Sequence, residues 1–418
     1  MAADRAAADA ETASANRDHW LNAERIRVYS WMTVVIFAAV YVAWLGLSLP
    51  SLVDPRGKPF GYDFMAYWSA ARLALTGRPE AVFDEGVIAA VQHAAVPALP
   101  GIVFPWHYPP TFLLPVVPLG VLPYPAALAL FVVAMAALGA VLVHRVLPDR
   151  RAWITAAATP AGLIGLLDGQ NAFLTVALAG FALLWLERRP IAAGVLIGLL
   201  ALKPHLAVLF PLALLAEGRW RSIAAAAVTV IVLTVASFLA FGWEIWAAFL
   251  RHLPMTEAMG ETGAVPWGTM PSAYVFVRAL GASVAVARGL QIAVAVFAGG
   301  VVWRAWRNRA GPFEAKAATF LAGSLLVSPY LFYYDLIWAA LAVAWLALLG
   351  LRSGFRRGER EIYLFAWLAP AVMPPVFALT SLQLGFPALL LLLLAAARRA
   401  GPTRRHGVAC ATVNHRSG

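Results

Sequence analysis

Apolar residues along this chain fall into twelve runs separated by short polar segments. Most runs contain 15 to 22 residues rich in Leu, Ala and Val, without the apolar and polar alternation of barrel strands. Only helices and closed barrels satisfy the backbone polar groups inside a bilayer, so the pattern predicts membrane-spanning helices. The predicted spans are 28–49, 124–145, 152–167, 172–187, 190–202, 204–216, 221–241, 284–303, 313–328, 335–350, 361–374 and 383–397.

The fold class that follows is an all-α polytopic membrane protein with about twelve transmembrane helices and a long first external loop. Residues 111–121 are too few to cross a bilayer and predict a re-entrant or partial helix. The predicted parts are a cytoplasmic N-terminal arm (1–27), a transmembrane domain (28–398) with external loops at 50–110 and 242–280, and a basic, disordered cytoplasmic tail (399–418).

Charged residues between the runs are sorted by side. Of the 32 Lys and Arg residues, 24 lie in the two terminal segments and in the turns that follow every second run. Because basic residues accumulate on the cytoplasmic side of membrane proteins, both termini are predicted to be cytoplasmic, in a plasma (inner) membrane. The alternate turns carry Asp63, His107, Asp168, Lys203 and Asp335, which predicts an active site on the external, periplasmic side.

Composition narrows the function further. The chain is 62% hydrophobic and 13% charged, which excludes a soluble domain of this length. Its net charge of +11 is scattered through loops without forming a groove-sized patch, so no nucleic-acid partner is expected. The single cysteine, Cys410, permits no internal disulfide, and no metal-ligand cluster or cofactor motif is apparent. The expected partners include membrane lipids.

Asp63 precedes a helical pattern formed by Phe64, Tyr67, Trp68 and other apolar residues, which predicts an amphipathic helix on the outer face. Two roles stay open for its carboxylate. It is either the N-cap of this helix, contributing about 1 kcal/mol, or a general base in a cleft at the membrane surface. Arg72 of the same helix is a candidate substrate-binding residue.

Lys203 stands where the runs 190–202 and 204–216 meet, before the helix-breaking Pro204. This break predicts a hairpin that ends below the outer rim, with Lys203 and His205 in a cavity open to the outside. Lys203 is either a phosphate-binding cation or a side chain that reaches to the interface. His205 either contacts the phosphate or lines the turn.

The remaining candidates each have a structural alternative. His107 and Tyr108 start a Pro-rich segment that either binds a sugar or forms a rigid interfacial loop. Gln170 and Asn171 follow Asp168-Gly169 in a tight turn, from which they can hydrogen-bond sugar hydroxyls. Two further candidates open a predicted helix, where an aromatic belt and an N-cap are the alternatives: Tyr334 and Asp335.

A series of short motifs resembles glycosyltransferase family 87, from about residue 60 to 350. In order, they are Tyr62-Asp63 with Tyr67-Trp68, Gly77-Arg78-Pro79, Tyr108-Pro109-Pro110 with Pro115 and Pro118, Gly169-Gln170-Asn171, Gly194 with Gly198, Lys203-Pro204, and Ser328-Pro329 followed by Tyr334-Asp335-Leu336.

The resemblance implies a GT-C superfamily enzyme with Asp63 as the catalytic carboxylate. It also implies inversion at the anomeric carbon and a polyprenyl-phosphate sugar, typically mannose, as donor. The chain departs from related sequences in having Tyr62, not a second acid, before Asp63. It also has Tyr330, Phe332 and Tyr333 where a His is common.

The chemistry agrees with the resemblance. Attack of a hydroxyl on an anomeric carbon needs a base, and Lys or Arg can stabilise a departing lipid monophosphate without a metal. We therefore expect a hexosyltransferase that acts at the outer leaflet, with a glycolipid or glycan as acceptor. The alternatives are a lipid or polysaccharide transporter, for which midplane polar groups or repeated halves are typical, and a non-catalytic scaffold.

Overall fold

The computed structural model describes residues 19–401 except 50, 55–56, 148 and 264, and also leaves out the side chains of 256, 257, 259 and 262. These residues form α-helices and short 3-10 helices, with no strand beyond one isolated bridge between Val53 and Pro59. The predicted all-α polytopic membrane fold is confirmed.

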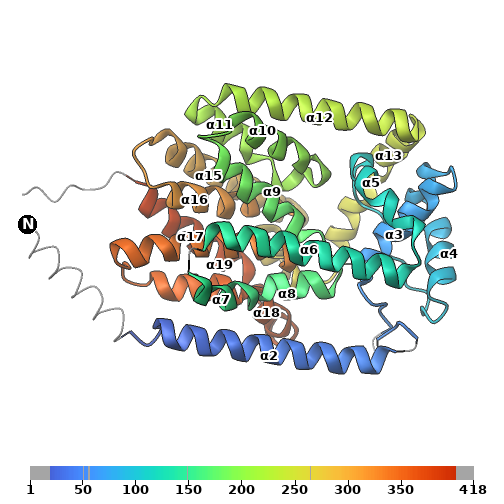
Figure 1. Ribbon diagram of the computed structural model, residues 1–418, viewed down its shortest axis with the longest axis horizontal. Helices are drawn as coiled ribbons and strands as arrows, with labels where there is room; N and C mark the ends of the chain where they lie inside the picture. Colours follow the sequence, from blue (N-terminus) through green and yellow to red (C-terminus); the bar gives the residue numbers. More distant parts are fainter. Residues whose placement is uncertain (1–18, 50, 55–56, 148, 264, 402–418) are drawn as a thin grey trace, which may run out of the picture.

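Six helices are long and apolar enough to cross a membrane. Figure 1 shows α2 and α12 along opposite edges of the molecule, with α6 running between them. In α2 and in α12, only 6% of an apolar 18-residue stretch is buried inside the protein. These two helices therefore expose their apolar side chains to lipid. The six are α2 (Ala23–Ser48), α6 (Tyr124–Val146), α12 (Trp220–Phe241), α15 (Val284–Arg307), Tyr333–Ser353 (3-10 helix η7, Tyr333–Leu336, with α17, Ile337–Ser353) and α18 (Glu359–Thr380).

Shorter helices build the core between these spans. The predicted span 152–167 is divided at Pro160, because proline starts a new helix there. The predicted hairpin at Lys203-Pro204 forms as a break between two 3-10 turns. These helices are η3 (Arg150–Ala152), α7 (Trp153–Ala157), α8 (Pro160–Leu167), α9 (Ala172–Trp185), α10 (Pro190–Leu199), η4 (Leu200–Leu202), η5 (Pro204–Leu206), α11 (Leu209–Glu217), α16 (Phe313–Val327) and α19 (Gly385–Ala400). The number of crossings stays a prediction.

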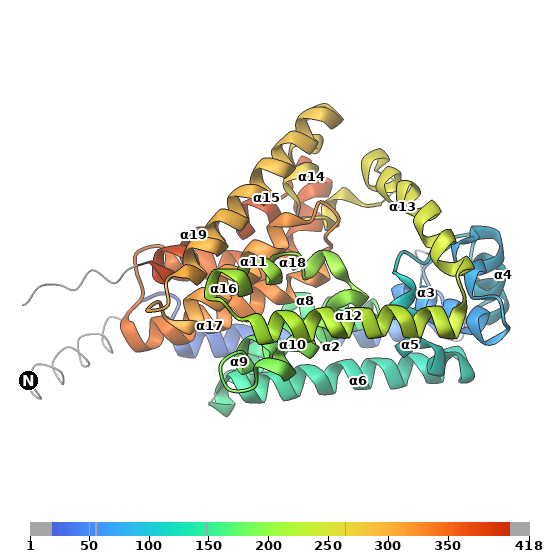
Figure 2. The same cartoon turned by 90° about the horizontal axis from the view of Figure 1, so that it is seen from above.

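The first of the two segments that the sequence predicts to be external is largely helical. The partial helix expected at 111–121 is present as α5 and η2, and α3 lies among its neighbours at one end of the molecule (Figures 1 and 2). The expectation of an amphipathic surface helix after Asp63 is wrong, because α4, α5, η2 and α6 cover α3 and bury nine of its residues. The loop contains α3 (Tyr62–Leu75), η1 (Pro79–Phe83), α4 (Glu85–Ala95), α5 (Pro110–Val116) and η2 (Val117–Val121).

The second external segment contains α13 (Glu244–Thr262), η6 (Trp267–Thr269) and α14 (Ala273–Ala279). Figure 2 shows α13 rising from the end of α12, at the same end of the molecule as α3 and α4. The base of α13 packs against η1 of the first loop. The two external segments are therefore joined by direct contact.

The ends of the predicted transmembrane domain shift slightly. Helix α2 begins at Ala23, inside the expected arm, and α19 continues to Ala400, inside the expected tail. Arg399, expected in a disordered tail, is instead buried and ion-paired with Glu359. The rest of the predicted tail and residues 1–18 of the predicted arm lie outside the described residues.

Candidate active site

Helix α3 begins on a glycine turn that places Asp63 against a second turn. Gly61 is left-handed with φ 57° and is the N-cap residue, and no side chain caps this helix. Asp63 is therefore the second helical residue and not the cap. Its backbone NH donates to the carbonyl of Asp168 at 3.0 Å, which ties the start of α3 to the turn between α8 and α9.

Glycine is required on the opposite side of this contact as well. Gly169 has φ 68°, and a Cβ there would lie 2.6 Å from Cβ of Phe64 and 3.2 Å from Cα of Gly61. The two turns can approach this closely only because residue 169 has no side chain. Their approach brings Gln170 to Asp63, although 107 residues separate them in the sequence.

Gln170 holds the Asp63 carboxylate. Its Nε2 donates to Oδ2 of Asp63 at 2.8 Å, and its Oε1 accepts from Tyr67 Oη at 2.7 Å and Tyr108 Oη at 3.3 Å. The hydroxyls of Tyr67 and Tyr108 are themselves 2.7 Å apart. The amide orientation of Gln170 is thus fixed, so that its NH₂ group faces the carboxylate.

Lys203 lies at the helix break beside this network. Its Nζ donates to Oδ1 of Asp335 at 2.6 Å and stands 5.1 Å from the ring centroid of Tyr334. Lys203 is 5% exposed and Asp335 is fully buried, so the pair is shielded from water. Three predicted site residues from two distant segments therefore meet at one place.

A second carboxylate, Asp168, lies next to Asp63. Its Oδ2 accepts from Tyr333 Oη at 3.0 Å, and the hydroxyls of Tyr333 and Tyr62 are 3.2 Å apart. Asp168 is 5% exposed, and no ion pair forms at either Asp63 or Asp168 within the described parts of the chain. Two aspartates thus share one end of the fold, supplied by different turns.

Burial changes the protonation of both acids, which lie outside the six long spans. Burial raises the pKa of Asp63 to about 6, against the hydrogen bond from Gln170 and the positive charge of Lys203, which lower it. Burial also raises the pKa of Asp168 to about 8, and the negative charge of Asp63 adds to that rise. Near neutral pH, Asp63 is ionised and able to accept a proton, while Asp168 largely retains its own.

The other predicted site residues are placed less centrally. Asn171 is 1% exposed, and its side-chain amide has no hydrogen-bond partner among the described residues. Nε2 of His205 is likewise buried and unpartnered there, one turn beyond Lys203. Both groups retain the capacity to bind a polar ligand.

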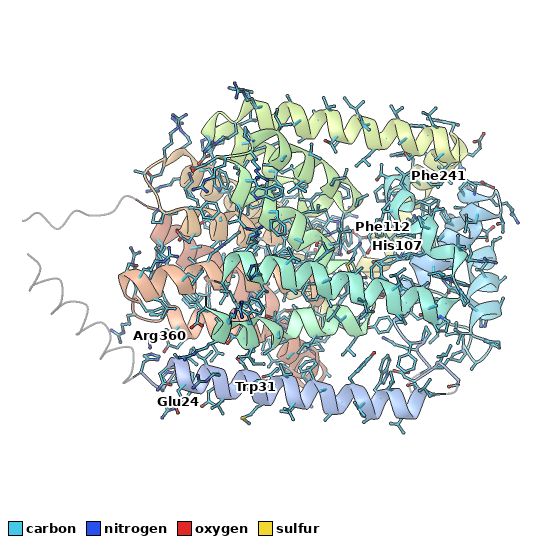
Figure 3. The ribbon with its side chains drawn as sticks, in the orientation of Figure 1. Glu24, Trp31, His107, Phe112, Phe241 and Arg360 are labelled. Atoms are coloured by element: carbon cyan, nitrogen blue, oxygen red, sulfur yellow. The ribbon has the colours of Figure 1, made fainter. Side chains whose placement is uncertain are left out.

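Two predicted site residues, His107 and Arg72, make their hydrogen bonds outside the network around Asp63. His107 Nδ1 lies 3.2 Å from Nε2 of His252 on α13, so His107 links the two external segments, and Figure 3 shows it near α5. Burial lowers its pKa to about 4, which keeps the ring neutral above that pH. Arg72 is exposed at the far end of α3, where it donates to the carbonyl of Gly120 at 3.1 Å. The structure does not bring Arg72 to Asp63.

Sequence reasoning did not assign roles to Tyr67, Tyr62, Tyr333 and Asp168. One signal was available, because Tyr67 is four residues after Asp63 and such residues share a helix face. No comparable signal marks the contact between Tyr333 and Asp168, since 165 residues lie between them. The described residues contain no group of three or more His, Cys, Asp or Glu side chains that could hold a metal ion.

The architecture is that of an all-α polytopic membrane protein, in which the Asp63 and Asp168 carboxylates lie near the paired cation Lys203. A sequence model of glycosyltransferase family 87 matches residues 106–329, more than half of the chain, and the protein belongs to that family. It is therefore a membrane glycosyltransferase. No curated protein and no solved structure matches the chain.

The sequence predicted a resemblance to this family from about residue 60 to 350. The family match confirms its central part, residues 106–329. It covers Tyr108, Gln170 and Lys203. Asp63 and Asp335 lie outside the matched residues, so the case for their roles depends on geometry: Asp63 is hydrogen-bonded to Gln170, and Asp335 to Lys203, both within the matched part.

Proposed function

We propose that the protein transfers a hexose, with mannose the first choice, from a polyprenyl-phosphate donor to a lipid-linked or envelope glycan at the outer leaflet. The observation that carries this proposal is the Asp63 carboxylate, which is partly buried, forms no ion pair among the described residues and is oriented by Gln170. A carboxylate held in this way is suited to act as a general base.

The reaction that we propose is a single displacement. An acceptor hydroxyl oxygen attacks the anomeric carbon, and its proton moves to Asp63. The bond from the anomeric carbon to the phosphate oxygen breaks on the opposite face, and its electron pair leaves with polyprenyl phosphate. The configuration is inverted, because one carboxylate acts as base and no glycosyl-enzyme forms.

Positive charge on the protein can stabilise the leaving phosphate. The charge of Lys203 acts on Tyr108 of the Gln170 network and favours ionised Asp63. A lipid monophosphate carries less charge than a nucleotide diphosphate, so we propose that lysine takes the role that a metal has elsewhere. We propose that Asn171, Tyr108 and His205 hydrogen-bond sugar hydroxyls or the phosphate, which the unpartnered side-chain atoms of Asn171 and His205 among the described residues support.

The direct test is the choice of donor. Purified protein in lipid nanodiscs is given radiolabelled polyprenyl-phosphate mannose, polyprenyl-phosphate glucose or GDP-mannose, with lipids from the source membrane as acceptors. We expect label to move to an acceptor from a polyprenyl-phosphate sugar in the presence of EDTA, and none from GDP-mannose. Transfer from GDP-mannose alone would overturn the proposed donor.

The proposed topology needs its own test, because the donor must reach the site from outside. In a Cys410→Ser background, Thr76→Cys places a thiol on an exposed residue of the first external loop, and Arg357→Cys places one at the opposite end. An impermeant maleimide added to intact cells should label Thr76→Cys and leave Arg357→Cys unlabelled. The reverse pattern would place the site on the cytoplasmic side.

A further inference from the structure

The proposed site has less free positive charge than its sequence suggests. Lys203 is the expected phosphate ligand, but its ammonium is 2.6 Å from the buried Asp335 carboxylate. A lysine that is already paired attracts an incoming phosphate less than a free one, because the carboxylate repels the same phosphate. A lipid phosphate that enters this site would be stabilised by a second, unpaired cation.

Lys58 is such a cation. It lies on a tight turn before α3, where its backbone NH donates to Oδ1 of Asp54 at 2.8 Å and its carbonyl accepts from the Asp54 NH at 2.7 Å. Gly57, with φ 80°, makes this turn possible. The backbone of Lys58 is therefore held in place, while its side chain is only partly buried.

The side chain of Lys58 points towards the proposed site. Its Nζ is 4.4 Å from the ring centroid of Tyr62, the residue next to Asp63. The Tyr62 hydroxyl contacts the Tyr333 hydroxyl, which donates a hydrogen bond to Asp168. No carboxylate forms an ion pair with Lys58 among the described residues, so its charge is available to a ligand.

The charge of Lys58 is felt at both acids. Burial raises the pKa values of Asp63 and Asp168, and the positive charge of Lys58 is among the effects that lower them. An ammonium that acts on both carboxylates from the partly exposed side of Tyr62 is well placed to meet a phosphate beside Asp63.

We propose that Lys58 binds the phosphate of the polyprenyl-phosphate donor, and that Tyr62 holds its ammonium over the site. This inference rests on the proposed function, since it names a residue that binds the phosphate of the same polyprenyl-phosphate donor. No covalent step is assigned to Lys58. As the anomeric bond breaks, the phosphate oxygen gains negative charge, and the ammonium stabilises that charge without giving up its proton.

The test measures binding of the leaving group, so that it does not depend on turnover. Purified protein is titrated with a short-chain polyprenyl phosphate and, separately, with the corresponding polyprenol, with binding followed by thermal shift and native mass spectrometry. Lys58→Met keeps a long side chain over Tyr62 and removes the charge, while Lys58→Arg keeps the charge. Arg78→Met is the matched control, because it removes an exposed charge from the same loop beyond the end of α3.

We expect Lys58→Met to weaken polyprenyl-phosphate binding by about tenfold to a hundredfold, the usual range for a lost hydrogen bond to a charged group. Lys58→Arg and Arg78→Met should bind it like the wild type, and polyprenol binding should stay the same in all variants. Unchanged phosphate binding by a folded Lys58→Met protein would overturn the inference while leaving the proposed donor intact.

A wild-type protein that binds no polyprenyl phosphate would give a different result. It would remove the proposed donor and the role of Lys58 with it. An equal loss of phosphate and polyprenol binding in Lys58→Met would show that Lys58 only packs against Tyr62, which would also overturn the inference.

Discussion

Buried carboxylates occur at both ends of this molecule, and the two ends treat them differently. At the end that carries most Lys and Arg, Glu217 is ion-paired with Lys316 and with Arg219, and Glu359 is ion-paired with Arg399. At the opposite end, Asp63 accepts a hydrogen bond from Gln170 and Asp168 accepts one from Tyr333, and neither acid forms an ion pair among the described residues. Figure 3 marks the two ends by Arg360 and Glu24 on one side and by His107 and Phe241 on the other.

The difference distinguishes carboxylates that stabilise the fold from carboxylates that are suited to exchange a proton. A buried ion pair fixes two segments together, and removing one partner leaves the other charge buried and uncompensated. A buried carboxylate without a cation has a raised pKa and is ready to exchange a proton. Lys203 and Asp335 lie between these cases, because they form a closed pair within the proposed site. The comparison assigns Asp63 to chemistry and Glu359 to structure, and each assignment can be tested.

The largest effect on stability is expected from breaking the structural pair. Arg399→Met leaves Glu359 buried without its cation and should cost about 3–5 kcal/mol of unfolding free energy, with the donor KM unchanged in the protein that folds. Denaturation in detergent measures the loss. Arg398→Met, one residue earlier and exposed, is the control and should stay within about 0.5 kcal/mol of the wild type.

The next effect concerns the orientation of the base. Gln170→Leu removes the hydrogen bond to Asp63 and should lower kcat by about tenfold to a hundredfold. Since that hydrogen bond lowers the pKa of Asp63, its loss should also move the acid limb of the kcat/KM profile above its wild-type position near pH 6. A profile that does not move would show that Gln170 does not act through Asp63.

A smaller effect, of opposite sign, is expected for the stability of Asp63→Asn. The pKa of Asp63 is about 6 in the folded protein and about 3.9 in an unfolded chain, so its ionisation destabilises the fold as the pH rises through this window. Asn avoids that cost. The shift of about two pKa units corresponds to about 3 kcal/mol, and solvent screening at this partly exposed carboxylate reduces that value. The variant should therefore be more stable than the wild type by about 2 kcal/mol at pH 8 and equally stable near pH 3.

Glu359→Gln is the control for this difference, because it should be less stable than the wild type at pH 8. The measurement is the apparent melting temperature of the wild type and of both variants at pH 8 and near pH 3. If Asp63→Asn were also destabilised at pH 8, the Asp63 carboxylate would be stabilising the fold, and the contrast between the two ends would fail.

The smallest effect is expected at Arg72. Its side chain is exposed and bonds the carbonyl of Gly120, so Arg72→Met should cost less than about 1 kcal/mol and change kcat/KM by less than about threefold. Steady-state kinetics with the polyprenyl-phosphate donor provide the check. A loss above tenfold would show that Arg72, the cation of α3, acts on the substrate.

Local signals in the sequence predicted much of the framework. The runs of apolar residues located the six long spans, the proline after Lys203 located the break, and the short segment 111–121 formed the expected partial helix. These features depend on residues that are neighbours in the chain, so their physics is visible in the sequence.

Contacts between distant segments were not predictable in the same way. The burial of α3 depends on five other elements, because η1 packs against it together with α4, α5, η2 and α6. The pairing of Arg399 with Glu359 depends on how α18 and α19 pack. The orientation of Asp63 depends on two glycine turns that fit together. Sequence spacing shows that Lys203 and Asp335 are unusual in a membrane, but it does not show that they neutralise each other.

The most direct test of the claim that Asp63 is the base compares turnover by the wild type and by Asp63→Asn. Both proteins are purified in the same nanodiscs and assayed at pH 7.5 with saturating polyprenyl-phosphate sugar. Asn cannot take the acceptor proton, so we predict a rate about 10²- to 10⁴-fold lower in a protein that is at least as stable as the wild type. A wild-type rate of sugar transfer by Asp63→Asn would contradict the account.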